Sequence, residues 1–317
     1  MPRVLTALVA SFSLLALAAI LLFLLGAAWP SIRYNGLTFL TGTTWNLGNL
    51  YAAAPVRVDG VRAMPGATFG ALVFVLGTLL TSVLALVIAV PTSVGIAIFL
   101  TEYAPRRVGG AVSFVVELLA GVPSVVYGLW GIIVLVPWIG SWLGPALARA
   151  LGFVPFLRGP VGTGAGLLAS GLVLALMVVP IIASTVREAL LMVPGELREG
   201  ALALGMTRWE AIRAVSLPFA RTGIVGASIL GLGRALGETM AVLMVSGDAI
   251  NLLPRNLYSP VGTMAATIAA QLDSALTDAS GMAVHALAEL ALVLFLITVA
   301  VNVLARLVVR TGAMRRT

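Results

Sequence analysis

The sequence predicts an all-α integral membrane protein with six transmembrane helices. Of the 317 residues, 60% are apolar and only 10% are charged, whereas charged residues make up about a quarter of a soluble globular protein. Several apolar runs exceed the roughly 18 residues that mark a membrane-spanning helix. The runs are continuous rather than alternating in polarity, which favours helices over a membrane β-barrel.

The six predicted spans follow the apolar runs in order along the chain. The first is longer than the apolar core of a signal peptide, which has about 7 to 15 residues, and we expect it to be retained. Pro91 is expected to bend the second, because proline removes a backbone donor and crowds the preceding turn. Residues 138–163, with several prolines, are expected to form a loop. The predicted spans are residues 4–28, 67–100, 111–136, 164–186, 223–246 and 283–309.

Six spans put both termini on one side of the membrane, and the arginines predict which side. Twelve arginines lie on the side of the termini, six lie on the opposite side, and Arg234 lies within a span. Arginine-rich loops face the cytoplasm. The termini and residues 187–221 are therefore predicted to be cytoplasmic in a multi-pass plasma-membrane protein. The formal charge of +7 then belongs to the membrane faces and gives no reason to expect nucleic-acid binding.

The residue types that are missing exclude several kinds of chemistry. The chain has no Lys, so it cannot hold a Walker A loop, whose Lys reaches the nucleotide phosphates. It has no Cys and a single His, His285, which excludes thiol nucleophiles and Cys/His metal clusters. We therefore expect no catalytic residue, metal or cofactor on this chain, and any ATP and Mg²⁺ on another subunit. An intramembrane hydrolase fits poorly, because no predicted span holds an Asp, whereas a carrier that works without ATP stays open.

Residues 187–221 are polar and predict a helix outside the bilayer. Pro194 can begin this helix, because proline suits the first helical position. Glu196 and Glu199 then lie near the positive end of the helix dipole. One apolar face recurs at positions i, i+4 and i+7 of an otherwise polar helix, and it consists of Leu197, Ala201 and Leu204.

A second helix is predicted to follow at once. Gly205 is expected to end the first helix, because glycine readily adopts the conformation that terminates helices. Thr207 and Glu210 match the T-x-x-E capping box that starts a helix. This second helix is expected to end before Pro218. The pair of helices is either a docking element for another protein or a well-capped loop that rests on the membrane.

Arg234 is a charged residue inside an apolar predicted span, where a charge is unexpected. It lies about 16 Å into the fifth predicted span at 1.5 Å per residue, where an arginine costs about 2.5 to 3.5 kcal/mol to insert. We expect it to face the interior and to pair with Glu238, one turn later. The pair either fixes helix packing or offers a guanidinium to an anion in transit. Four small residues on the same helix predict a packing stripe: Gly223, Ala227, Gly231 and Ala235.

Three further residues within the predicted spans are candidates for a functional or structural role: Glu117, His285 and Glu289. Glu117, about two turns from the cytoplasmic end of the third span, belongs either to a transport pathway or to helix packing. His285 and Glu289 lie at positions i and i+4 near the start of the sixth span, where they are expected to form a structural pair.

The run REGALALGMTRWEAIRAVSLP, residues 198–218, resembles the EAA loop of binding-protein-dependent ABC importer permeases. Gly200 stands where the first alanine of that motif is usual. In that family the loop forms a coupling helix that docks in a groove of the ATPase subunit. The resemblance implies the type I, MetI-like permease architecture, and it marks as ATPase-coupling residues Glu199, Ala201, Leu204, Gly205 and Thr207. The other positions that match the motif are Ile212, Leu217 and Pro218.

Three further runs narrow the resemblance to PstC-type permeases of phosphate importers, over almost the whole chain. They are WPSI (residues 29–32), ELLAGVPSVVYGLWG (residues 117–131) and GLGRALGETMAVLMVSG (residues 231–247). The last differs from the sister PstA-type permeases after its GET triplet. The resemblance implies one permease domain over residues 1–317, with its core in residues 67–309.

The same resemblance implies a function and a set of partners. The chain would carry inorganic phosphate across the bacterial inner membrane together with a PstA-type permease, a dimer of PstB-type ATPases and an external phosphate-binding protein. Arg234, Glu238 and Glu117 are then the candidates for the transport pathway. A permease for another oxyanion, such as sulfate or molybdate, stays open.

Overall fold

The computed structural model describes residues 2–50, 54–58 and 60–314 and is mostly helical. Within these residues, six helical runs are long and apolar enough to cross a membrane, as the sequence predicts. The second, fourth and sixth agree closely with the predicted spans, whereas the third and fifth are displaced. The six runs are Leu14–Asn35, Leu72–Tyr103, Ser124–Ala150, Leu167–Leu191, Arg208–Leu236 and Met282–Leu304.

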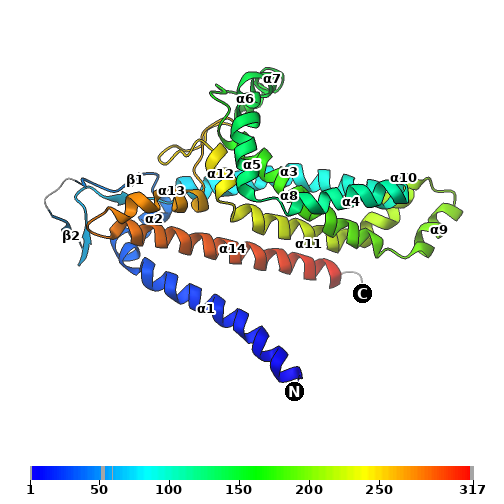
Figure 1. Cartoon of the computed structure of the whole chain (residues 1–317), viewed down its shortest axis with the longest axis horizontal. Coiled ribbons are helices and arrows are strands. Elements are labelled where there is room, and N and C mark those ends of the chain that lie inside the picture. Colours follow the sequence, from blue (N-terminus) through cyan, green and yellow to red (C-terminus); the bar gives the residue numbers. More distant parts are fainter. Residues whose placement is uncertain (1, 51–53, 59, 315–317) are drawn as a thin grey trace.

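Long helices lie side by side along the long axis of the molecule, with α3 (Leu72–Ile98) and α8 (Leu167–Leu191) packed together (Figure 1). Small side chains of α3, such as Ala89, share one buried cluster with Ile182 and other branched side chains of α8. The hydroxyl of Ser93 donates to the carbonyl of Val179 at 3.1 Å. The remaining long helices are α1 (Pro2–Asn35), α11 (Leu217–Leu236) and α14 (Met282–Met314).

The third span is not where the sequence predicts it. Residues 111–136 do not form one helix, because α4 (Arg106–Ala120) ends before Pro123, and a new helical run begins at Ser124. Proline disfavours helical geometry in the residue before it and suits the start of the next helix. The helical run continues through two π-turns to Ala150, so much of the predicted loop 138–163 is helical too. This run comprises α5 (Ser124–Trp130), α6 (Val136–Trp138) and α7 (Gly144–Ala150).

One end of the bundle, here called the strand end, is covered by short elements (Figure 1). Trp45 packs edge-on against Phe39, Phe69 and Phe74, with ring centroids 6.5, 5.1 and 5.5 Å away. Two antiparallel pairs form there, β1 with β4 and β2 with β3. The short elements are α2 (Thr38–Thr41), β1 (Trp45–Asn46), β2 (Val56–Val58), β3 (Val61–Ala63), β4 (Thr68–Phe69) and α13 (Met264–Leu276).

Polar side chains of α14 reach across to α1 rather than to one another. The Nδ1 atom of His285 lies 2.7 Å from the carbonyl oxygen of Ala27. The buried carboxyl of Glu289 lies near the polar side chains of Ser31 and Asn35, and its Oε2 atom has no hydrogen-bond partner among the described residues. The expected pair between His285 and Glu289 is therefore wrong. Both side chains face α1, which packs against this face of α14 and offers polar groups of its own.

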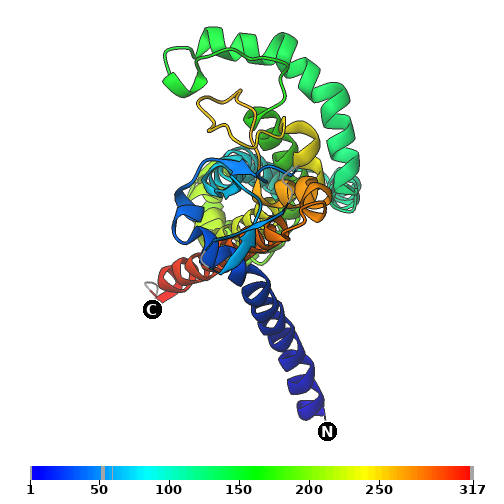
Figure 2. The ribbon, with the colours of Figure 1, turned by 90° about the vertical axis from the view of Figure 1, so that its left-hand side faces the viewer.

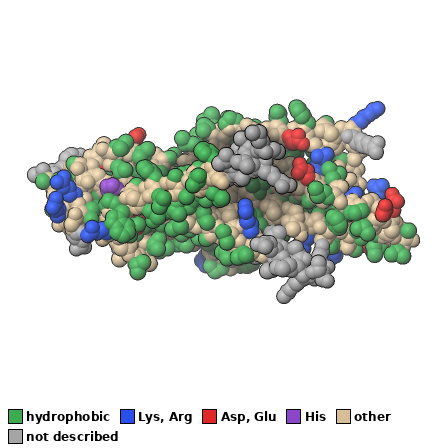
Figure 3. Space-filling view, turned by 90° about the horizontal axis from the view of Figure 1, so that it is seen from below, with side chains coloured by type: hydrophobic (Ala, Val, Ile, Leu, Met, Phe, Trp, Pro, Cys, Tyr) green, Lys and Arg blue, Asp and Glu red, His purple; other side chains and the backbone are tan. Residues whose placement is uncertain are grey.

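Two segments leave the bundle with apolar surfaces exposed. Figure 2 shows the run from α5 to α7 arching away on one side and α1 leaving on the other. Large side chains of α1 such as Phe12 and Phe23 are more than 70% exposed. In Figure 3 charged side chains gather mainly towards the two ends of the face, with one basic group near the middle, and hydrophobic side chains cover much of the rest. Such a surface fits lipid or a partner subunit rather than water.

Candidate docking and transport site

The predicted pair of helices in residues 187–221 is present at the end of the bundle opposite the strand end (Figure 1). The first is α9 (Gly195–Ala203). The second begins at α10 (Arg208–Ala211) with the predicted capping box. The Glu210 carboxylate accepts from the Thr207 amide at 2.7 Å, and the Thr207 hydroxyl accepts from the Glu210 amide at 3.4 Å. These bonds satisfy amides that a helix start leaves unpaired.

Gly205 separates the two helices and has a backbone φ of +84° with open space around its α-carbon. Its role is therefore conformational, because L-residues with a side chain rarely adopt positive φ. On α9 only Ala201 is buried, while Leu204 is 82% exposed. The predicted apolar face thus divides into an inward alanine and outward leucines. Beside them is an open groove lined by Leu204, Gly205, Met206, Glu210, Arg213 and Ala214.

The second helix does not end before Pro218, contrary to the prediction. It passes through a π-turn, Ile212–Ser216, and continues without a break as α11 to Leu236. Pro218 therefore lies inside a continuous helical run, directly after the π segment, where proline perturbs the helix without ending it. The fifth span is consequently a direct extension of the second helix of residues 187–221, beginning at Arg208 rather than Gly223.

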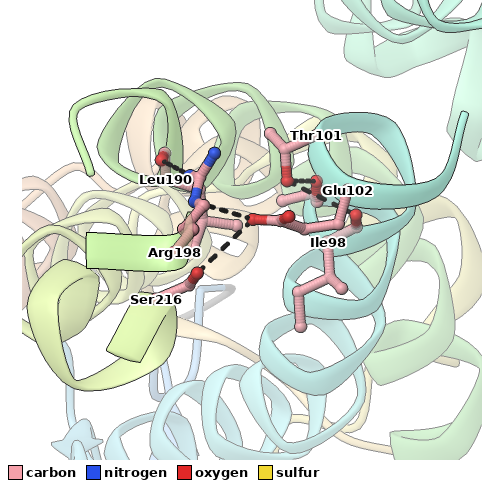
Figure 4. Close-up of polar contacts among 7 residues, drawn as sticks. Ile98, Thr101, Glu102, Leu190, Arg198 and Ser216 are labelled. Atoms are coloured by element: carbon pink, nitrogen blue, oxygen red, sulfur yellow. Dashed lines mark hydrogen bonds and ion pairs between the residues drawn. The ribbon is translucent and has the colours of Figure 1, made fainter. Parts of the chain in front are cut away.

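A cluster of polar contacts holds α9 to the bundle (Figure 4). The Arg198 Nε atom lies 3.3 Å from the Glu102 Oε1 atom, and the two side chains are 24% and 15% exposed. The Nε–H is not aligned for a hydrogen bond, so this contact is electrostatic. Arg198 Nη2 donates to the carbonyl of Leu190 at 2.6 Å, and the Ser216 hydroxyl donates to Glu102 at 3.4 Å. We call these four residues the Glu102 cluster.

Arg234 and Glu238 do not form the predicted buried pair. Arg234 lies in the last turn of α11 with its side chain exposed, close enough to Tyr127 of α5 to interact electrostatically. The helix ends at Leu236, and Glu238 follows in a short link to α12 (Met240–Val245). There Glu238 Oε1 accepts from the Ala241 amide at 3.5 Å. In the part of the chain that the structure describes, no ion pair joins Arg234 to Glu238, because the helix unwinds between them.

The predicted stripe of small residues on α11 does face α8. Ala227 and Ala235 are buried in the cluster that holds Val178 and Ile182. A β-carbon added at Gly231 would lie 2.7 Å from side-chain atoms of these two residues. The stripe therefore permits close approach of the two helices. Arg234 projects from a different face of α11, and α8 does not cover that face.

Glu117 lies on α4 with its side chain exposed. Among the described residues, no ion pair or hydrogen bond connects it to Arg234 or Glu238. The structure therefore does not bring the three predicted pathway residues together within this chain.

Asp248, a residue that no sequence motif indicates, has two unusual features. Its φ of +40° is a conformation rarely adopted by residues with a side chain. Its Oδ1 atom is buried without a hydrogen-bond partner in the described structure, and burial raises the pKa of the Asp248 carboxyl. It follows α12 and Gly247. The Ser-Gly-Asp sequence there is a turn signal, but nothing in it indicates burial.

Comparison with known proteins places this geometry in a family context. Residues 93–311 match the family described as the binding-protein-dependent transport system inner membrane component. The chain is 54% identical to the phosphate transport system permease protein PstC 1 of Mycobacterium tuberculosis, over 89% of this chain and 84% of that protein. It is 43% identical to PstC of Haemophilus influenzae, over 96% and 90%.

Solved structures support the fold. The methionine transporter MetNI in an inward-facing conformation matches with a TM-score of 0.51 at 22% identity, over 77% of this chain and 94% of that one. A bacterial ABC transporter that imports alginate matches with a TM-score of 0.52 at 17% identity, over 75% and 78%. Both are ABC transporters, so the six-helix arrangement is the MetI-type permease fold that the sequence predicts.

Proposed function

This chain belongs to the binding-protein-dependent transport system inner membrane component family, and we propose that it is the permease subunit of an ATP-driven importer of inorganic phosphate. The assignment of phosphate as the substrate rests on the sequence identity of 54% and 43% to two phosphate permeases over most of the chain. The permease crosses the bacterial inner membrane six times, with both termini and α9 in the cytoplasm.

The partners follow from what this chain lacks and what it exposes. With no Lys for a nucleotide loop, ATP and Mg²⁺ are bound by a dimer of PstB-type ATPases. Those ATPases dock on α9 and the groove beside Leu204, where exposed apolar side chains need a partner. The coupling residues are Glu199, Ala201, Leu204, Gly205 and Thr207. A PstA-type permease completes the membrane unit, and an external phosphate-binding protein delivers the anion.

Arg234 is the side chain we assign to the anion route, with Glu238 and Glu117 as accessory groups. Its guanidinium stands at the end of α11, on a face that α8 does not cover. Within a membrane such a charge requires a polar partner or a hydrated pathway. A route between two permease subunits supplies both, and a guanidinium binds phosphate oxygens through two parallel hydrogen bonds.

The test is ATP-dependent uptake of radiolabelled phosphate by vesicles that contain the whole complex. We expect uptake that needs ATP and the binding protein and is unaffected by excess sulfate or molybdate. Competition by either of those oxyanions would reassign the substrate. Uptake that persists without the ATPase would indicate a carrier that works without ATP.

A further inference from the structure

The Glu102 cluster joins α9 to the ends of α3 and α8 and to the helical segment that leads into α11. Glu102 lies in the π-turn Phe99–Tyr103 that ends α3, and Arg198 lies on α9. Leu190 is in the last turn of α8, and Ser216 is the last residue before α11. No other ion pair between α9 and the bundle occurs in the described residues. The docking helix is therefore tied to the membrane helices at this cluster.

Electrostatic interactions explain why Arg198 is bound at this position. A carboxylate is unfavourable at the C-terminal end of a helix, where the helix dipole is negative. Arg198 offsets that cost for α3 by pairing with Glu102, and it satisfies a terminal carbonyl of α8. Because both charged side chains are mostly buried, removing one leaves the other without its partner, which costs more than breaking a surface pair.

We propose that Glu102 and Arg198 are positioning residues that make α9 move with the ends of α3 and α8 as one body. This inference rests on the proposed function, in which α9 docks on the ATPase. A rigid link at this point passes the displacement of α9 to the helices that pack around α11. Ser216 adds the start of α11 to the same body through its hydrogen bond to Glu102.

The first measurement is phosphate taken up per ATP hydrolysed, in vesicles that hold the full complex. We expect Arg198→Ala and Glu102→Ala each to lower this ratio about tenfold, the factor that corresponds to about 1.4 kcal/mol. The double variant should be no worse than either single one, because the two residues act through one contact. Arg107→Ala is the matched control, since it removes an exposed arginine at the start of α4.

A second measurement tests whether α9 moves together with α3, and it requires no transported substrate. The chain has no Cys, so spin labels can be placed at Tyr103→Cys and Leu202→Cys, both exposed positions at the end of α3 and on α9. With Arg198 present, we expect one narrow distance distribution that is unchanged by ATP. With Arg198→Ala, the distribution should broaden or shift when ATP binds. Arg107→Ala should behave as the unsubstituted protein.

The outcomes separate this inference from the proposed function. Absence of phosphate uptake by the unsubstituted complex would reject the substrate, while the label distances still test the link. A distance distribution that Arg198→Ala leaves unchanged in both states would overturn the link, as would additive losses in the double variant. If the Arg198→Ala complex does not assemble, Arg198→Lys takes its place in both measurements. A single ammonium cannot contact Glu102 and the Leu190 carbonyl in the fork geometry of a guanidinium, so an intermediate loss is expected.

Discussion

Gly77 of α3 lies directly against the carbonyl oxygen of Gly262, with no space between them for a side chain. The amide of Met264 donates to the hydroxyl of Thr78 at 2.9 Å in the same place. The start of α13 is therefore docked on α3 by its backbone. Gly77 has ordinary helical geometry, so its backbone conformation does not require glycine. Glycine is required there because the backbone at Gly262 lies so close.

Gly77→Ala should destabilise the folded chain by about 1 to 3 kcal/mol, the usual cost of overpacking a well-filled interior. The measurement is the Tm of the purified complex in detergent. Gly95→Ala is the control, because it lies on the same helix with open space around its α-carbon and should be neutral or slightly stabilising. An unchanged Tm for Gly77→Ala would mean that α13 does not rest on α3 in this way.

Arg234→Ala should lower phosphate uptake at least about tenfold if the guanidinium supplies a charge-assisted bond worth about 1.5 to 3 kcal/mol. Co-purification of the ATPase should be unchanged, because Arg234 lies away from α9. Arg234→Lys should retain part of the activity, since it keeps the charge but loses the bidentate geometry. Arg158→Ala removes another exposed arginine and serves as the control. Normal uptake by Arg234→Ala would remove this residue from the anion route.

The sequence predicted what depends on spacing within one helix and missed what depends on where helices break or meet. The capping box at Thr207 and the small-residue stripe through Ala227 involve near neighbours, and both are present. The Arg234 pairing failed because the helix ends at Leu236, before its fourth neighbour. The Glu102 cluster was missed because it joins residues far apart in the chain. Sequence spacing does not show which helix end will lie beside which.

Gly205→Ala should weaken docking of the ATPase, because the φ of +84° at this residue costs a side-chain-bearing residue about 1 to 2 kcal/mol. We expect less ATPase to co-purify and faster hydrogen exchange in α9. Gly200→Ala makes the opposite change in the middle of α9, where the space is open, and should slow exchange by stabilising the helix by about 0.5 to 1 kcal/mol. Equal behaviour of the two variants would contradict the conformational role of Gly205.

Asp248→Asn should raise the Tm of the complex at neutral pH. Burial raises the pKa of the Asp248 carboxyl, so the folded state holds its proton to a higher pH than the unfolded state does. The stability that this difference provides is fully present below about pH 4, the usual pKa of Asp, and is lost as the pH rises through the folded-state pKa. Asparagine carries no charge and also tolerates positive φ. The gain in Tm should therefore disappear below about pH 4, whereas Asp273→Asn, at an exposed position of α13, should show no such pH-dependent gain. A Tm difference between Asp248→Asn and the unsubstituted complex that is independent of pH would show that burial of the charge is not its cause.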